Sequence, residues 1–150
     1  MRIVLQRVSS ASVSVDGSII GSIGRGYVLL LCVMKGDTEA DVDRLAEKIC
    51  GLRLFDGADG KINDRSLLEI AGEVLVISQF TLAADLAKGR RPDYTAAAGA
   101  QVAQELYEGF QKKLLSLGVK MVQGGRFGAL MQVSLVNDGP VTLLLDTALS

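Results

Sequence analysis

The 150-residue sequence contains no histidine, and this absence removes several catalytic designs at once. A Ser-His-Asp triad and a Cys-His pair both need imidazole as the general base, so neither is possible here. Two separated cysteines without histidine do not give the usual zinc ligand set, and the glycines match neither a dinucleotide-binding motif nor a P-loop. We therefore expect no metal and no cofactor, and chemistry that depends on backbone groups and hydroxyls.

Cysteines and long apolar runs are also scarce. Cys32 and Cys50 are too few for a disulfide framework, and the sequence does not open on a charged start followed by the apolar core of a signal peptide. The longest apolar run, 27–34, is far shorter than the ~20 residues that a membrane-spanning helix needs. We therefore expect a cytoplasmic protein that does not enter a membrane.

An excess of basic residues is missing as well, since the net charge is −1 and the isoelectric point is about 5.4. A protein that grips duplex nucleic acid usually shows a broad basic surface. The one compact basic group is Lys88-Gly89-Arg90-Arg91, which is either a solvated loop or a small local contact for nucleic acid. Any nucleic-acid contact must therefore be local.

The sequence is rich in apolar residues, with 49% hydrophobic residues and a mean hydropathy of +0.32. Such an excess often means that further apolar surface is buried between subunits, so we expect a homo-oligomer. A single, well-packed domain is the alternative.

Residue periodicity predicts a single α+β domain over 1–150, with two main helices packed on a mixed, partly barrel-like sheet. One helix should run from Thr38 to about Leu52, since Thr38 is a good N-cap. A longer helix should open at Pro92 and Asp93 and close at Gly118. Its apolar face should be Val102, Leu106, Phe110 and Leu114. The predicted strands are 2–9, 11–15, 18–23, 27–34, 74–80, 120–123, 131–136 and 141–145, with turn-rich loops at 55–64 and 83–91.

Two polar segments stand out at the ends of predicted strands. At Ser78-Gln79-Phe80-Thr81, backbone N–H groups released from strand pairing could form an oxyanion hole, with help from the Ser78 and Thr81 hydroxyls. The alternative is that these hydroxyls only cap a turn. At Gly139-Pro140, the Gly-Pro pair between two strand-like runs is either an ordinary turn or a rigid device that aims backbone groups.

Taken together, these segments resemble the D-aminoacyl-tRNA deacylase family, formerly called D-tyrosyl-tRNA deacylase. The resemblance covers nearly the whole chain, and several motifs occur in the family's order and spacing. Leu130 occupies a position that is often polar in the family. The motifs are Gln6-Arg7-Val8, Ala11-Ser12-Val13, Ser78-Gln79-Phe80-Thr81-Leu82-Ala83, Lys88-Gly89-Arg90-Arg91-Pro92, Gly125-Arg126-Phe127-Gly128-Ala129, Met131-Gln132-Val133 and Asn137-Asp138-Gly139-Pro140-Val141-Thr142.

The resemblance implies a cytosolic homodimer that hydrolyses the ester between a D-amino acid and the 3′-terminal adenosine of tRNA, and that also accepts glycyl-tRNA. It implies that Gly139 and Pro140 form a Gly-cis-Pro pair that reaches into the partner's site and rejects L-amino acids. Arg7 would help to hold this pair. The implied catalytic residues are Ser78, Gln79, Phe80 and Thr81, and the implied supporting residues are Arg7, Asn137, Val141, Thr142 and Met131.

Elementary chemistry favours one mechanism for such a site. Backbone N–H groups near Phe80 and Thr81 could stabilise the oxyanion, at ~3–4 kcal/mol for a good donor. The Thr81 hydroxyl has no base beside it in the motif, so we favour activation of water by the ribose 2′-OH, with Thr81 as a positioning group. Rigid carbonyls at Gly139 and Pro140 could accept from the substrate amino group and exclude an L side chain. The rival interpretations are a non-enzymatic RNA-binding module and a small-molecule esterase or amidase that uses Thr81 as its nucleophile.

Overall fold

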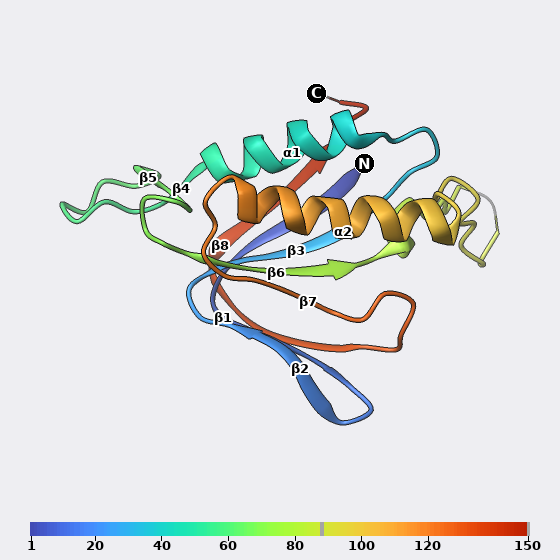
Figure 1. The fold of residues 1–150 in the computed structure, drawn as a ribbon, viewed down its shortest axis with the longest axis horizontal. Coiled ribbons are helices and arrows are strands. Elements are labelled where there is room, and N and C mark those ends of the chain that lie inside the picture. The colour runs from blue at the N-terminus through green and yellow to red at the C-terminus, as the bar shows by residue number, and fades with distance from the viewer. Residues whose placement is uncertain (88, 150) are drawn as a thin grey trace.

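Two helices lie side by side across one face of a curved sheet in the computed structural model, which describes residues 1–87 and 89–149 (Figure 1). The predicted fold class, a single α+β domain with a mixed, partly barrel-like sheet, is confirmed. The helices are α1 (Glu39–Gly51) and α2 (Ala100–Ser116). The strands are β1 (Arg2–Val15), β2 (Ser18–Ile23), β3 (Gly26–Cys32), β4 (Arg53–Phe55), β5 (Arg65–Ser66), β6 (Glu73–Ser78), β7 (Val122–Gly124) and β8 (Gln132–Asp146).

The main sheet has the order β2-β1-β3-β6-β7, and β8 pairs with β1 as well. The β3–β6 and β6–β7 pairs are parallel and the others are antiparallel. Its two ends approach each other, because a Cβ atom on Gly21 of β2 would lie 3.1 Å from the carbonyl oxygen of Gly124 of β7. The sheet is thus nearly closed, and β4 and β5 form a separate small hairpin.

Both faces of the central strands are buried. On β3, Leu29 and Leu31 face the helices, whereas Val28 belongs to a second cluster inside the barrel. On β6, Val76 likewise faces the helices, and Ile77 belongs to the cluster inside the barrel. Fully burying one such side chain contributes roughly 1.5–3 kcal/mol, so strands with near-continuous apolar runs take the centre of the sheet.

Helix α1 matches its prediction, with Thr38 as N-cap and Leu52 as C-cap. The Thr38 N–H donates to the Asp41 carboxylate at 2.9 Å, which satisfies one of the donors left free at a helix start. Leu45 and Ile49 on its apolar face are fully buried. Within the described residues, no helix is long and apolar enough to cross a bilayer.

The predicted start of the second helix at Pro92 and Asp93 is wrong, because α2 begins at Ala100. Asp93 instead forms a bridge with Asp85, in which each N–H donates to the other carbonyl, at 2.8 and 3.0 Å. A bridge to the preceding loop has therefore overridden the local helix signal. Of the predicted apolar face, Leu106, Phe110 and Leu114 are buried, but Val102 is 49% exposed.

Strand continuity also differs from the prediction. The runs 2–9 and 11–15 are one strand, β1, whose register shifts between Gln6 and Ser10 as it exchanges β3 for β2 as its neighbour. The runs 131–136 and 141–145 likewise belong to one strand, β8. Gly139-Pro140 is therefore a bulge within a strand that remains paired on both sides, and not a turn between two strands.

Candidate active site

A cavity of about 500 Å³ opens where β6 ends, between α2 and the segment that leads into β8. Ser78, Gln79, Phe80 and Met131, all predicted site residues, line this cavity. The remaining lining residues are Leu31, Cys32, Val33, Ile77, Ala97, Ala98, Ala100, Ala103, Tyr107, Phe127, Gly128, Ala129, Leu130 and Val133.

The chain turns sharply at this end of β6. The strand stops at Ser78, so the predicted continuation to Phe80 is wrong, and Phe80–Ala83 forms a short 3₁₀ helix, which we call the Phe80 turn. The Gln79 N–H donates to the Leu31 carbonyl at 2.7 Å, which ties the turn to β3. The first N–H groups of any helical turn have no acceptor within it, so those of Phe80 and Thr81 are not used by the turn itself.

Thr81 is not among the residues that line the cavity. The Gln79 side-chain amide donates to the Thr81 oxygen at 2.5 Å. An activated nucleophile needs a base that removes its proton, whereas this contact supplies a donor. The geometry therefore suits Thr81 to orienting Gln79.

No acidic or basic side chain occurs among the described residues that line the cavity. Burial raises the pKa of the Cys32 thiol, so the thiolate is disfavoured. Burial also raises the pKa of Tyr107 to about 12, and its hydroxyl donates to the Val76 carbonyl at 2.8 Å. Both groups are neutral near pH 7, so the cavity offers amides, hydroxyls and backbone groups.

The opposite wall comes from the segment that precedes α2, which the sequence predicts to be part of the second helix. Ala98 donates its N–H to the Val33 carbonyl at 3.0 Å, and Ala97 forms a bridge with Met34. At the mouth, the Phe80 ring meets the Tyr94 ring edge-on, at 5.1 Å between centroids. The signal that could have revealed this wall is Gly99, the N-cap of α2, because glycine disfavours the interior of a helix.

The predicted selectivity residues, Gly139 and Pro140, lie in a different place. Five residue steps of β8, from Asn137 to Thr142, span only two steps of β1, so the excess residues bulge outward. Gly139 and Pro140 are exposed and the peptide bond between them is cis. We call residues 138–141 the Gly-Pro loop.

Arg7 holds the base of the Gly-Pro loop. It is 8% exposed, and its Nε donates to the Asp138 carbonyl at 2.8 Å while a terminal nitrogen contacts the Leu54 carbonyl. The Asn137 amide donates to the Arg7 carbonyl at 2.9 Å and to the Val141 carbonyl at 3.2 Å. The charge-assisted hydrogen bonds of Arg7 fix the main chain more firmly than the neutral bonds of Asn137 do.

Thr142, just after the Gly-Pro loop, and Gly139 within it also determine its shape. The Thr142 hydroxyl accepts from the Gln6 amide at 3.2 Å, so it marks where pairing with β1 resumes. A Cβ atom on Gly139 would lie 2.6 Å from the Asn137 side-chain oxygen and would also meet the Val141 nitrogen. Glycine is therefore the residue that fits this position.

The loop and the cavity are separated within one chain. Arg7, at the base of the loop, pairs with Tyr27 at one end of β3, whereas Ser78 pairs with Leu31 near the other end. Four residues along a strand correspond to ~13 Å before the distance across the strands is added.

The described residues also include no group of three His, Cys, Asp or Glu side chains that could hold a metal ion.

Known proteins are similar to this chain in sequence and in fold. The chain is 57% identical over 149 residues to a D-aminoacyl-tRNA deacylase of Roseiflexus castenholzii, covering 99% of this chain and 94% of the relative. A solved structure of a c-Myc DNA unwinding element binding protein superimposes with a TM-score of 0.92 at 38% identity, covering 98% of this chain and 99% of that one. A probable eukaryotic D-amino acid tRNA deacylase shares the fold, with a TM-score of 0.81 at 18% identity over 96% of this chain and 97% of that one. Because the sequence model of the D-Tyr-tRNA(Tyr) deacylase family matches residues 4–146, the chain belongs to that family.

Proposed function

We propose that this protein is a D-aminoacyl-tRNA deacylase, which hydrolyses the ester between a D-amino acid and the 3′-terminal adenosine of tRNA and acts in the cytoplasm. The observation that carries the proposal is a cavity without a charged side chain among its described lining residues, beside a turn with available backbone N–H groups. An aminoacyl ester is already labile. Oriented donors and a bound water can therefore hydrolyse it without an acid–base pair from the protein.

In the proposed mechanism, the ester carbonyl lies against the Phe80 turn. The N–H groups of Phe80 and Thr81 stabilise the tetrahedral oxyanion, at ~3–4 kcal/mol for a good donor. The ribose 2′-OH of the terminal adenosine helps to activate water, because no lining residue supplies a base in the described part of the cavity. Gln79, held by Thr81, and Ser78 position the substrate.

The proposed active unit is a homodimer in which the Gly-Pro loop of one subunit completes the cavity of the other. Apolar side chains are exposed near the sheet edges, with Ile19 69%, Val136 58% and Leu144 62% exposed. Among the described strands, β8 pairs with β1 alone, so its second edge is open, and such an edge is commonly covered by another chain. A partner would also bring an Arg7-held loop to a cavity that the chain's own Gly-Pro loop does not line.

The proposed basis of chirality is steric exclusion by the partner's Gly139 and Pro140. Main-chain carbonyls of a rigid loop accept from the substrate amino group and leave no room for an L side chain. Rejection by a wall does not require contact with the D side chain, so many D-amino acids should be accepted. Glycyl-tRNA should be accepted too, because glycine has no side chain to reject.

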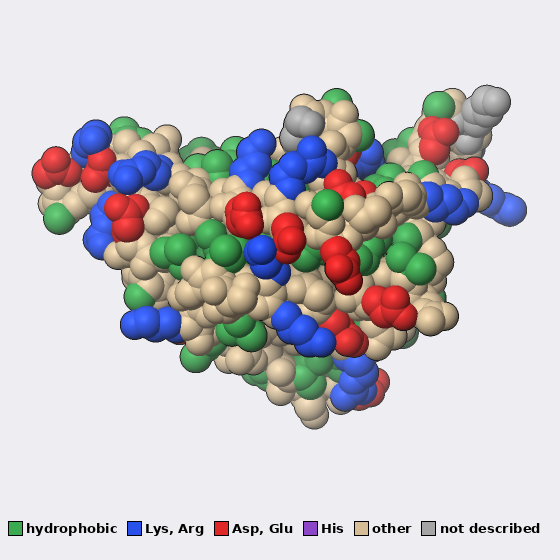
Figure 2. Space-filling view, turned by 45° about the horizontal axis from the view of Figure 1, so that its top comes forward, with side chains coloured by type: hydrophobic (Ala, Val, Ile, Leu, Met, Phe, Trp, Pro, Cys, Tyr) green, Lys and Arg blue, Asp and Glu red, His purple; other side chains and the backbone are tan. Residues whose placement is uncertain are grey.

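Broad nucleic-acid binding is the weaker alternative. One relative is named for binding a DNA unwinding element. In the present chain the net charge is −1, and Figure 2 shows Lys and Arg side chains interspersed with Asp and Glu over the face drawn. Tight duplex binding needs many cations that neutralise phosphates, so recognition of the tRNA end is favoured.

The decisive experiment compares D-Tyr-tRNA, L-Tyr-tRNA and free D-Tyr ethyl ester as substrates. We expect D-selective release from tRNA alone. Release from the free ester would support a generic esterase, and no release from any substrate would support a binding module. A D-Tyr-tRNA ending in 2′-deoxyadenosine should lose most of its rate, by about 10²-fold or more for a group that acts in general-base catalysis. An undiminished rate would refute the role of the 2′-OH.

A further inference from the structure

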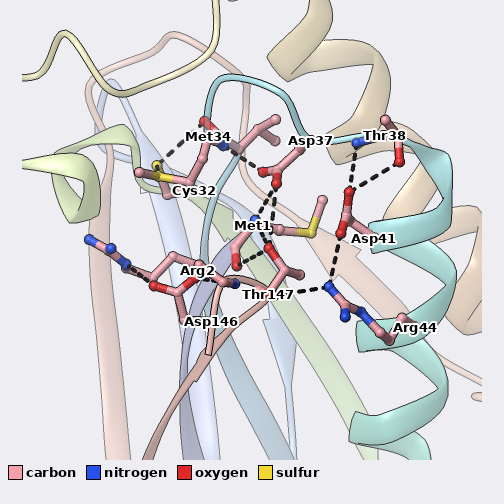
Figure 3. A network of polar contacts seen from close by, with 12 residues as sticks. Met1, Arg2, Cys32, Met34, Asp37, Thr38, Asp41, Arg44, Asp146 and Thr147 are labelled. Carbon is pink, nitrogen blue, oxygen red and sulfur yellow. Dashed lines mark hydrogen bonds and ion pairs between the residues drawn. The ribbon is translucent and has the colours of Figure 1, made fainter. Parts of the chain in front are cut away.

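Arg2 contacts the Phe80 turn but does not line the cavity. Its NH1 donates to the Leu82 carbonyl at 2.6 Å and its Nε to the Asp146 carboxylate at 2.9 Å. Arg2 opens β1 and Asp146 ends β8, and the two residues are paired in register. Figure 3 shows both of them beside Cys32, which pairs with Arg2 from the β3 side.

The Leu82 carbonyl is a natural target for such a cation. The turn uses the Gln79 and Thr81 carbonyls for its own bonds, since they accept from the N–H groups of Leu82 and Ala84 at 3.2 and 3.1 Å. The next donor along the chain, the Asp85 N–H, is committed to Asp93. The Leu82 carbonyl would otherwise lack a protein partner within this turn, and Arg2 supplies one.

Arg2 is itself held in a fixed orientation. Asp146 is 7% exposed, and its second oxygen accepts from the Ala148 N–H at 3.0 Å. Burial alone would raise the pKa of Asp146, but the Ala148 N–H and the Arg2 guanidinium together hold that pKa below its usual range. The carboxylate is therefore ionised near pH 7 and keeps the planar guanidinium aimed at the turn.

Neighbouring contacts anchor the same region. The Met1 nitrogen contacts the Asp37 carboxylate and the Thr147 hydroxyl, and the other Asp37 oxygen accepts from the Met34 N–H at 2.6 Å (Figure 3). Met34 leads into the bridge with Ala97, which is part of the opposite cavity wall. The Cys32 sulfur lies 3.6 Å from the Phe80 carbonyl and adds a weak contact to the turn.

We propose that Arg2 is a positioning residue for hydrolysis: it fixes the Phe80 turn, so that the N–H groups of Phe80 and Thr81 point at the reacting carbonyl. This inference rests on the proposed function. Arg2 does not line the cavity, so its effect passes through the Leu82 carbonyl. Loosening the turn weakens stabilisation of the transition state while leaving the ground-state binding surface in place.

The test compares Arg2→Met with Arg53→Met, a matched control far from the cavity. Arg53 also joins a main-chain carbonyl, that of Asp64, to a carboxylate, that of Glu69 at 3.6 Å. We expect Arg2→Met to lower kcat for D-Tyr-tRNA about tenfold to a hundredfold with KM nearly unchanged, as for a small misplacement of reacting groups. Arg2→Lys retains the positive charge but lacks the separate nitrogens that contact the Leu82 carbonyl and the Asp146 carboxylate, so it should recover part of kcat.

Amide hydrogen exchange gives a readout that does not depend on activity. The Leu82 and Ala84 amides should exchange faster in Arg2→Met than in the wild type, and Arg53→Met should leave them unchanged. If Arg2→Met matches Arg53→Met in both kcat and exchange, Arg2 has no positioning role. If the wild type fails to hydrolyse D-Tyr-tRNA, the proposed function is wrong, and the exchange experiment still decides whether Arg2 orders the turn.

Discussion

The Phe80 turn and the Gly-Pro loop both interrupt regular pairing, yet they are stabilised by different kinds of interaction. Neutral groups surround the cavity side of the turn, and the hydroxyl of Thr81 is held by an amide. The loop, in contrast, is fixed by the nearly buried guanidinium of Arg7 through the Asp138 carbonyl. This difference agrees with the proposed division of roles, in which the turn would present donors for chemistry and the loop would present an exposed, fixed shape for selection.

Gly139→Ala should have the largest effect on activity and selectivity. The new Cβ atom would collide with the Asn137 side chain and displace the loop. We expect kcat/KM for D-Tyr-tRNA to fall about a hundredfold, the cost of a shift of ~1 Å in a reacting geometry. The ratio of the D-Tyr-tRNA rate to the L-Tyr-tRNA rate should fall as well, because the excluding wall has moved. Steady-state rates on both substrates give these values.

Two comparisons make that result specific. Gly109→Ala, in α2 where an added Cβ meets nothing within 4 Å, should leave both rates unchanged. A mixed dimer of Gly139→Ala with a cavity-filling Ala98→Trp subunit should recover about half of the wild-type rate, because one intact cavity then faces one intact loop. If a verified mixed dimer recovered no activity, each cavity would be completed by the Gly-Pro loop of its own subunit.

The local parts of this architecture follow from the sequence, whereas the parts set by distant partners do not. The helix after Thr38 and the central strand at 27–34 were predictable because capping and apolar runs are local signals. The segment after Pro92 was mispredicted because it pairs with Asp85 in the preceding loop and with the distant Val33, and capping signals do not report such partners. The separation of Gly139 from Ser78 depends on strand order in the sheet, which residue patterns do not specify.

The double variant Arg90→Ala/Arg91→Ala tests whether a third region, beside the Phe80 turn, contributes to tRNA binding. Both residues are exposed in the loop that the Asp85–Asp93 bridge closes, and Lys88 of the same basic motif lies outside the described residues. We expect KM for D-Tyr-tRNA to rise about fivefold. The log–log dependence on salt should become shallower by about 0.7–0.9 for each phosphate that the variant no longer neutralises. Rates measured over a range of salt concentrations test this.

The control for that pair is Lys112→Ala/Lys120→Ala, which makes the same change in charge at exposed positions near the other end of α2. It should leave KM and the salt slope unchanged. A minimal substrate, D-Tyr esterified to adenosine, should be hydrolysed equally by both double variants and the wild type, since it carries no tRNA phosphates. Equal losses in the two double variants would mean that only net charge matters.

Among these variants, Thr81→Ala should have the smallest effect. It tests directly how the Phe80 turn contributes to the chemistry. If Thr81 only orients Gln79, its removal costs one neutral hydrogen bond, ~0.5 kcal/mol or about two- to threefold in kcat/KM. If Thr81 is the nucleophile, the loss should exceed ~10³-fold, as for other covalent catalysts. Thr81→Ser should resemble the wild type in either case and serves as the folding control. The rate ratio between substrates ending in adenosine and in 2′-deoxyadenosine should also be the same in Thr81→Ala as in the wild type. A ratio that collapses toward one would mean that Thr81 and the ribose hydroxyl act on the same proton, and the turn would then be more than an array of backbone donors.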